Sequence, residues 1–374
     1  MPERRSGLRL IVPVALAVIG LATLGLVRFA PAMLEGGPPT MPGAWPVRAL
    51  CHWDCGWYTA IARDGYWYEP GKQSPVAYFP AYPLAIRAVH VLGLDEFTAG
   101  VLLSLACGLL GLVLLRRLAD RLIPQHAALA QALLALYPWA VYLYGVVYSD
   151  ALFLALVVGA FLALEDERHV LATALGAAAV LCRPVAPAVV LGLAARSLEL
   201  RWKAGQRLRL VDALPLLAGL GLVGWMLFLE LRFDDPLAFV HVHDAPGWDQ
   251  PPGARTWLKE VFWQTVLDHW RPGATFKLGS QALVSIAAFC LAWPTAKRIG
   301  WGYGLYLAAV VGMPLLASKD FQGLGRYVMA GFPAFLTLAA LLGPHPRLSR
   351  AWLAVSALAL AGLAVAFGAD QYIA

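Results

Sequence analysis

Charged residues are scarce in this chain of 374 residues. Asp, Glu, Lys and Arg together make up 14% of it, whereas 60% is hydrophobic. Soluble domains have roughly a quarter of their residues charged, so this shortage excludes an ordinary soluble domain and indicates a chain surrounded mainly by lipid. The net charge of +6 needs no nucleic-acid partner to explain it. Lys and Arg gather in short loops that alternate along the chain, as they do in multi-pass membrane proteins.

Cysteine is also sparse, with five residues in the chain. Cys107, Cys182 and Cys290 fall in apolar segments, where we expect them to pack as small hydrophobic residues. Cys51 and Cys55 are four positions apart, and a disulfide between them is possible if their loop faces an oxidising compartment. No His or Cys pair nearby completes four ligands, so a zinc site is not expected.

Long apolar segments make up most of the chain. The first, about residues 8–30, is too long for the apolar region of a signal peptide and no small-residue cleavage site follows it, so we predict an uncleaved span. A short segment interrupted by proline, residues 77–94, is predicted to lie in the membrane interface. Further apolar segments occur at about 97–115, 127–146, 149–164, 169–198, 211–231, 279–296, 299–317, 328–343 and 351–368.

The distribution of charge predicts the topology. With a cytoplasmic N-terminus, the long loops at about 31–95 and 232–278 and the turn at 318–327 all lie on the outer face, whereas the strongly basic loops lie inside. Both ends of the segment 169–198 then lie inside, which requires a reversal where Arg183 precedes Pro184. Spans rich in alanine and leucine, joined by compact loops, favour a prokaryotic plasma membrane over the endoplasmic reticulum.

These features predict a polytopic membrane protein of the all-α class. We expect about eleven crossings, with the C-terminus on the outer face. No internal repeat or separable soluble domain is evident, so residues 1–374 are treated as one domain.

The stretch HWDCGWYTAIARDGYWYEP, residues 52–70, places a carboxylate and other charges among aromatic residues in the first outer loop. Trp and Tyr suit the membrane–water boundary, and stacking on a sugar ring is a second interpretation. Asp54 also has two interpretations. It is either the N-cap of a helix or a general base that takes a proton from an attacking hydroxyl at the membrane surface.

Two arginines lie in or beside apolar segments. A guanidinium at Arg183 or Arg326 needs an anion or several acceptors to offset its desolvation, and a phosphate would satisfy either. The alternative is structural pairing, of Arg183 with Asp150 and of Arg326 with Asp320 or a carbonyl group. Lys319 is a third candidate for an anionic ligand, or a plain surface lysine.

Other polar residues are open to both structural and functional interpretations. His241, His243 and Asp244 resemble a loose metal cluster, but without a third defined ligand we do not expect metal binding. Two other interpretations are that these residues form hydrogen bonds to an acceptor substrate or that they are exposed to solvent. Asp150 either caps a span or orients an arginine or a sugar hydroxyl, and Glu69 is either a loop charge or a substrate contact.

The same residues resemble a known family. HWDCGWYTAIARDGYWYE followed by AYFPAYPL resembles the first outer loop of the PIG-V family, the second mannosyltransferase of glycosylphosphatidylinositol assembly and its prokaryotic relatives. Tyr148-Ser149-Asp150, Arg183-Pro184 and GRYVMAGFPAF (residues 325–335) resemble three further motifs of that family, in the same order. Two positions differ, because Asp150 stands where Glu is usual and His243 precedes Trp248 where the family often has Gln followed by Trp.

The resemblance implies a GT-C glycosyltransferase that takes a sugar, mannose in this family, from a polyprenyl-phosphate donor at the outer face. Asp54 would deprotonate or orient the acceptor hydroxyl, which attacks with inversion, while Arg183 and Arg326, assisted by Lys319, stabilise the departing phosphate. Candidate substrate contacts are His52, Trp53, Trp57, Tyr58, Glu69, Tyr78, Asp150, His243 and Tyr327.

The resemblance also sets expectations about partners and cofactors. The acceptor would be a lipid, a glycolipid or a protein, and the lipid-linked sugar is a substrate, so no cofactor and no divalent metal are expected. No glycine-rich nucleotide-binding loop is evident.

Two alternatives stay open. A protein O-mannosyltransferase or an aminoarabinose transferase of the same superfamily is the nearest other enzyme. A transporter or flippase for a lipid-linked sugar would also have intramembrane arginines and a broken helix. The candidate residues collect on one face in dissimilar loops, which favours an enzyme.

Overall fold

The computed structural model describes residues 16, 18–30, 47–251, 253–268 and 272–373. Every regular element within these residues is a helix, so the predicted all-α class is confirmed. The main helices are α2 (Asp54–Asp64), α3 (Ala81–His90), α4 (Glu96–Leu122), α5 (Ala127–Ala135), α6 (Asp150–Glu165), α7 (His169–Val180), α8 (Ala186–Lys203), α9 (Leu220–Phe233), α13 (Pro272–Cys290), α14 (Ala292–Arg298), α15 (Trp301–Ala317), α16 (Leu324–Ala330), α17 (Pro333–Leu342) and α18 (Pro346–Gly368). Short helices α10 (Ala238–His241), α11 (Ala254–Trp257) and α12 (Glu260–Trp263) lie in the second long loop.

The chain is a multi-pass membrane protein. Four helical stretches in its described part are long and apolar enough to cross a membrane: Glu96–Leu122, Leu210–Phe233, Pro272–Arg298 and Pro346–Gly368. The pair α16 and α17, bent by 83°, makes a fifth if it is counted as one span. Val18–Ala30, His169–Val180 and Trp301–Ala317 are shorter apolar helices. The expected total of about eleven crossings stays a prediction, and part of the first predicted span lies outside the described residues.

One predicted span is wrong. The segment 127–146 is not continuous, because α5 ends at Ala135 and a 3₁₀ segment, η4, begins at Pro138. Pro138 has no N–H for a helical hydrogen bond, and its ring holds Tyr137 outside the helical region. The irregular turn that follows is fully enclosed by protein, which is where such backbone is tolerated at this depth. A side chain on Gly108 of α4 would collide with the carbonyl group of Leu143, so α4 can approach this turn closely.

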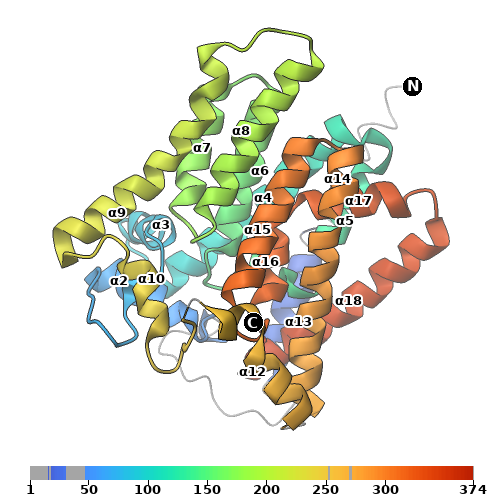
Figure 1. Cartoon of the computed structure of the whole chain (residues 1–374). Coiled ribbons are helices and arrows are strands. Elements are labelled where there is room, and N and C mark those ends of the chain that lie inside the picture. Colours follow the sequence, from blue (N-terminus) through green and yellow to red (C-terminus); the bar gives the residue numbers. More distant parts are fainter. Residues whose placement is uncertain (1–15, 17, 31–46, 252, 269–271, 374) are drawn as a thin grey trace.

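The predicted reversal within residues 169–198 is confirmed. α7 ends at Val180 and α8 begins at Ala186, with Arg183 in the turn between them. Asp212 lies near the far ends of both helices, because its Oδ1 is 2.8 Å from Arg201 Nε of α8 and 3.7 Å from His169 Nε2 at the start of α7. α7 and α8 therefore run antiparallel, side by side (Figure 1).

The two long loops lie together at one end of the molecule, as predicted. Figure 1 shows α2, α10, α12 and the C-terminus gathered at the lower end, away from the loop that follows α8. Gln73 donates a hydrogen bond to the Pro246 carbonyl at 3.1 Å, and Lys319 donates one to the Trp248 carbonyl at 2.7 Å. The turn at 318–327 thus joins both loops. The second loop is somewhat shorter than predicted, because α9 extends to Phe233 and α13 already begins at Pro272.

The segment predicted to lie in the interface forms α3. Leu84 on this helix and Val91 and Leu92 just after it are exposed apolar residues, as expected of a helix that rests on a membrane surface.

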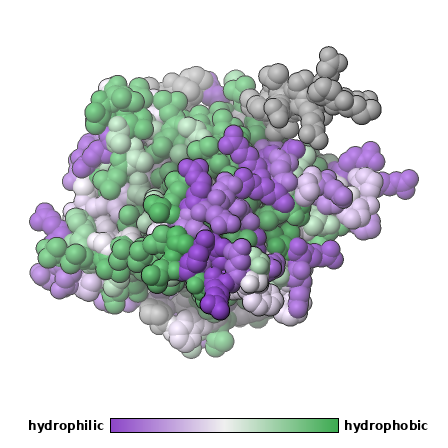
Figure 2. Space-filling view, turned by 90° about the horizontal axis from the view of Figure 1, so that it is seen from above, coloured by the Kyte–Doolittle hydropathy of each residue, from purple (hydrophilic) through white to green (hydrophobic). Residues whose placement is uncertain are grey.

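The opposite end of the molecule is polar. Figure 2 looks down on this end and shows hydrophilic side chains in its middle and toward its edges, with hydrophobic ones between them. Lys203, Arg207 and Arg209, in the loop after α8, are exposed there. The basic loop and the aromatic loop therefore lie at opposite ends, as the charge pattern predicts.

Candidate active site

Asp54 is the first residue of α2, and a disulfide holds the turn before it. Cys51 and Cys55 are bonded, with their Cα atoms 5.2 Å apart, so the possible disulfide is present. Trp53, the residue before the helix, has a positive φ of 48°, which is costly for a large side chain and needs support from its surroundings. The N-cap interpretation of Asp54 is wrong, because Trp53 occupies the cap position and makes no side-chain cap bond.

The Asp54 carboxylate is held by two side chains from distant parts of the chain. Tyr78 Oη donates a hydrogen bond to Oδ1 at 3.2 Å, and Arg326 Nη2 donates one to Oδ2 at 3.1 Å. The backbone N–H of Asp54 donates to Tyr148 Oη at 3.2 Å. The Asp54 side chain is still 18% exposed. It is therefore oriented on both oxygens and accessible from one side.

Asp150, Arg183 and Arg326 continue this contact into the protein. Arg183 donates a hydrogen bond from Nη1 to Asp150 Oδ1, which confirms the structural pairing considered for these two residues. Arg326 Nη1 lies 3.7 Å from Asp150 Oδ2. The proposed pairing of Arg326 with Asp320 is wrong, because Arg326 points between Asp54 and Asp150 instead. The four residues form a row of alternating charge, Asp54–Arg326–Asp150–Arg183, in which Asp150 and Arg183 are buried.

Aromatic rings enclose the two guanidinium groups. The Tyr327 ring centre is 4.1 Å from Arg183 Cζ, and the Tyr148 ring centre is 4.9 Å from Arg326 Cζ. Such cation–π contacts partly offset the loss of water around a guanidinium. Arg326 Nε nevertheless has no hydrogen-bond partner among the described residues. This buried donor is available to an acceptor that a ligand brings.

The second long loop adds aromatic side chains beside Asp54. Trp57 stacks on Tyr78 with ring centres 5.8 Å apart, and Trp248 lies 6.2 Å from Trp57 and 6.3 Å from Tyr78. His243 lies 5.6 Å from Trp248. Burial lowers the pKa of His243, and the nearby Asp244 only partly opposes this effect. The imidazole ring is therefore uncharged at pH 7. The structure thus brings His243 to the side of the site where Tyr78 contacts Asp54.

Some candidates lie apart from the charged row. His52 is buried, with Nδ1 2.9 Å from Asp370 Oδ1, and Trp53 packs against Tyr372 with ring centres 5.0 Å apart. Glu69 forms an exposed ion pair with Lys72.

Two further candidates serve as contacts between segments. Tyr58 Oη is 3.0 Å from Ser149 Oγ, which joins α2 to the start of α6. Lys319 is committed to the Trp248 carbonyl, so it lies at the junction of the outer loops.

Sequence reasoning missed residues that contact the row through their hydroxyl groups or rings. The Tyr148 hydroxyl accepts from the Asp54 backbone, and Tyr142 lies 5.8 Å from Arg326 Cζ. The motif Tyr148-Ser149-Asp150 contains the signal for Tyr148, because this hydroxyl lies two positions before the Asp150 carboxylate. Tyr372 follows the last span and no local pattern marks it, although burial raises its pKa to about 12, with Asp54 adding to the effect.

The two histidines of the second long loop have different partners. His241 Nδ1 lies 2.8 Å from Asp235 Oδ2, so His241 is engaged away from His243. Within the described part of the chain, no group of three or more His, Cys, Asp or Glu side chains could hold a metal ion.

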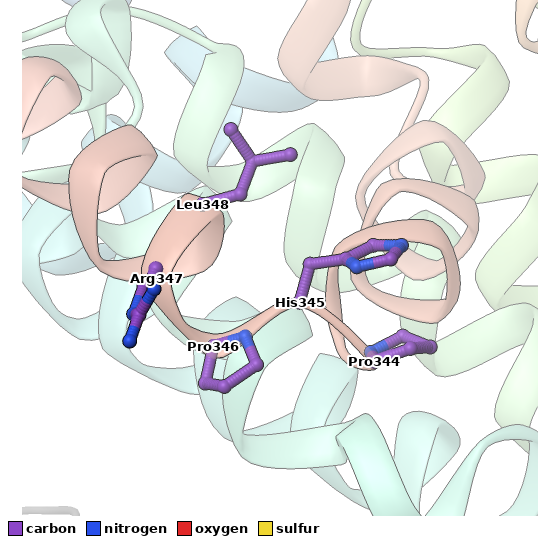
Figure 3. A pocket seen from close by; sticks show the side chains of 5 residues that line it. All are labelled: Pro344, His345, Pro346, Arg347 and Leu348. Atoms are coloured by element: carbon purple, nitrogen blue, oxygen red, sulfur yellow. The ribbon is translucent and has the colours of Figure 1, made fainter.

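A surface hollow lies elsewhere on the molecule. An open hollow of about 480 Å³ lies where α18 begins (Figure 3). It is lined by Pro344 and His345, just before the helix, and by Pro346, Arg347 and Leu348 in its first turn. None of the candidate residues contributes to it. The site is therefore assigned from the charged row and not from this hollow.

Comparison with known proteins gives a structural match. No protein-family model and no curated sequence matches the chain. The crystal structure of ArnT from Cupriavidus metallidurans bound to undecaprenyl phosphate superposes with a TM-score of 0.54 and 16% identity, over 92% of this chain and 62% of ArnT. ArnT in the apo state gives 0.51 and 16%, over 94% and 62%. The chain has the fold of ArnT.

The match covers less than two thirds of the length of ArnT. The archaeal oligosaccharyltransferase AglB from Archaeoglobus fulgidus, in complex with an inhibitory peptide and a dolichol-phosphate, gives a TM-score of 0.49 and 12% identity, over 96% of this chain and 55% of AglB. The likeness to ArnT agrees with the fold that the sequence resemblance implies, whereas membership of the GT-C superfamily and of the PIG-V family stays a prediction.

Proposed function

We propose that the protein is a membrane glycosyltransferase. It moves a sugar from a polyprenyl-phosphate donor to an acceptor hydroxyl, with inversion, at the face that holds the two long loops. The observation that carries this proposal is the row Asp54–Arg326–Asp150–Arg183, which presents a partly exposed carboxylate beside buried guanidinium groups. ArnT, which has the same fold, is bound to undecaprenyl phosphate in its crystal structure.

Asp54 acts as the general base. Tyr78 and Arg326 fix its two oxygens, and the exposed side of the carboxylate accepts the proton of an acceptor hydroxyl. As that proton moves to Asp54, the hydroxyl oxygen forms a bond to the anomeric carbon from the face opposite the leaving group. The bond between the anomeric carbon and the phosphate oxygen breaks, and its electron pair leaves with the polyprenyl phosphate. Asp54 then returns the proton to water.

The arginines stabilise the leaving group. A departing phosphate is a stable anion, so it needs cations and no proton from the enzyme. Arg326 has a free Nε donor beside its contact with Asp54, and its planar guanidinium group can donate hydrogen bonds to two phosphate oxygens. Arg183 stays paired with Asp150. Asp150 therefore shares its negative charge between two guanidinium groups and does not neutralise Arg326 alone.

The donor sugar follows from the resemblance to the PIG-V family, which uses mannose. The acceptor is a lipid, a glycolipid or a protein, and the plasma membrane is the proposed location, with the site on its outer face. A transporter would place its site near the middle of the membrane between related halves, whereas the charged row here adjoins the loops at one end of the molecule.

The test uses purified protein in lipid nanodiscs with polyprenyl-phosphate mannose and a panel of lipid, glycolipid and peptide acceptors. Release of polyprenyl phosphate and mass spectrometry of the acceptor report transfer. Asp54→Asn should lower turnover by about 10²–10⁴-fold, the range typical of general-base removal, with donor affinity kept. Asp64→Asn is the matched control, because it lies at the other end of α2 and its side chain is 60% exposed.

Two results would overturn the proposal. One is near-normal turnover in folded Asp54→Asn protein. The other is an unmodified protein that neither binds polyprenyl phosphate nor releases it from polyprenyl-phosphate mannose or other polyprenyl-phosphate sugars.

A further inference from the structure

The charged row is balanced before any substrate binds. Asp54 and Asp150 offset Arg183 and Arg326 one for one. A lipid-linked sugar phosphate brings one negative charge, and its phosphate leaves with more. Placing that anion beside a neutral, largely buried cluster is costly unless another cation or free donors are at hand. The structure therefore calls for further donors near Arg326.

Gln281 of α13 has such a donor. Its Oε1 accepts a hydrogen bond at 3.2 Å from the backbone N–H of Gly325, the residue before Arg326. That bond sets the orientation of the amide group. The Gln281 side chain is fully buried, yet its Nε2 has no hydrogen-bond partner among the described residues. Unpaired buried donors are rare because they are costly. Two of them occur here, Gln281 Nε2 and Arg326 Nε, and the hydrogen bond from Gly325 to Gln281 connects the residue next to Arg326 with α13.

Lys277 is a cation on the same helix as Gln281. It lies four residues before Gln281, so both side chains project from the same face of α13. Its Nζ is 4.7 Å from the ring centre of Tyr372, and that ring packs against Trp53, the neighbour of Asp54. No ion pair of Lys277 is found in the described part of the chain, although Asp320 is near enough to interact electrostatically. An unpaired ammonium in an apolar helix indicates a functional site.

We propose that Lys277 and Gln281 of α13 bind the phosphate of the lipid-linked donor together with Arg326. This inference rests on the proposed function and replaces Lys319, which is engaged with the Trp248 carbonyl, as the third phosphate contact. It also gives the donor a direction of approach. Phe276, next to Lys277, is 79% exposed, so the polyprenyl chain lies along the lipid-facing side of α13 while its phosphate turns inward.

The test compares matched lysine variants. Lys277→Gln removes the proposed contact, and Lys297→Gln is its control, because Lys297 lies near the other end of the same helical stretch with its Nζ 4.6 Å from the Trp293 ring centre. The affinity of each purified variant for undecaprenyl phosphate is measured in nanodiscs by native mass spectrometry. Lys277→Gln should bind about tenfold more weakly, the loss expected for one charged hydrogen bond, and Lys297→Gln should bind like the unmodified protein.

A second variant addresses Gln281. Gln281→Glu keeps an oxygen for the Gly325 N–H but replaces the free donor by a negative charge, so it should raise the KM for the donor while kcat at saturating donor changes less. Lys277→Arg keeps the positive charge and should restore affinity that Lys277→Gln loses. A merely structural role of α13 would change thermal stability in these variants and leave the KM of folded protein unaltered.

The outcomes separate this inference from the proposed function. If unmodified protein binds undecaprenyl phosphate and Lys277→Gln binds it equally well, α13 is not part of the phosphate site, and the glycosyltransferase assignment still stands. If the unmodified protein binds no polyprenyl phosphate at all and transfers no sugar, both are overturned.

Discussion

The guanidinium group of Arg326 lies 3.1 Å from the carboxylate of Asp54, although 272 residues separate them in the chain. Each partner also contacts a third residue, because Tyr78 donates to Asp54 and Asp150 lies beside Arg326. The proposed base and the proposed phosphate site are thus in direct contact. A phosphate that draws Arg326 toward itself would release one oxygen of Asp54, which makes that carboxylate a better proton acceptor when the donor is bound.

Tyr78→Phe tests how Asp54 is oriented. Burial raises the pKa of Tyr78 well above its usual value, with Asp54 adding to the effect, so the hydroxyl keeps its proton and donates at any physiological pH. Its removal should lower kcat about tenfold, the worth of one hydrogen bond to a charged group, while donor affinity stays the same. Steady-state kinetics measure both quantities.

Tyr68→Phe is the matched control, because the Tyr68 hydroxyl also donates to a carboxylate, that of Asp235, at 3.3 Å. Equal kcat values for the two variants would show that the contact between Tyr78 and Asp54 does not matter for turnover.

Asp150→Ala tests the buried end of the charged row. The Asp150 side chain is only 1% exposed, and its loss leaves the guanidinium groups of Arg183 and Arg326 near each other without a carboxylate between them. We expect a loss of about 3–5 kcal/mol in the free energy of unfolding, as for other broken buried ion pairs. Thermal unfolding in detergent, followed by tryptophan fluorescence, measures it.

Asp150→Glu keeps the charge and should be much less destabilising. If Asp150→Ala unfolds at the same temperature as the unmodified protein, the row is not a stabilising unit.

The disulfide between Cys51 and Cys55 should matter for both stability and turnover. It closes a very short loop, so replacing both cysteines by serine should cost about 2 kcal/mol on a loop-entropy estimate. Because Asp54 lies inside that loop, turnover should fall as well. Cys290→Ser, at an exposed free cysteine, is the control. Full activity after reduction, with the reduced state verified by mass, would contradict a positioning role.

Stability at acid pH should depend on His52. Burial lowers the pKa of His52 below its usual value of 6.5, and the neighbouring Asp370 only partly opposes this. His52 then takes up a proton more readily in the unfolded chain than in the folded protein. Its contribution to the free energy of unfolding is therefore fully present above pH 6.5 and is lost as the pH drops below that value.

Melting temperatures measured between pH 5 and 8, about the range in which histidine changes charge, should fall with decreasing pH in the unmodified protein and less steeply in His52→Gln. Asp370→Asn removes the opposing charge and should make the fall steeper. Parallel curves for all three proteins would exclude His52 as the group responsible.

Local features of the sequence determined a large part of the fold. Apolar runs predict helices because lipid cannot satisfy backbone polar groups, and Arg183 followed by Pro184 predicts the reversal between α7 and α8 because proline cannot continue a helix. Cys51 and Cys55 are close enough along the chain to pair without any long-range contact. The family motifs likewise identified Asp54, Asp150, Arg183 and Arg326 as the residues of interest.

Only the tertiary structure decided which partners these residues have. Arg326 meets Asp54 and not the nearby Asp320, because α16 packs where α2 and α6 begin, and no local pattern encodes that contact. The break in 127–146 places Tyr142 beside Arg326, although apolar composition alone favoured a continuous span. Lys277 falls in the predicted outer loop and Gln281 in a predicted apolar segment, and nothing local relates either residue to Arg326. Only the packing of α13 against α16 does so. Hydrophobicity and proline act over a few residues, whereas the pairing of buried charges depends on how whole helices pack.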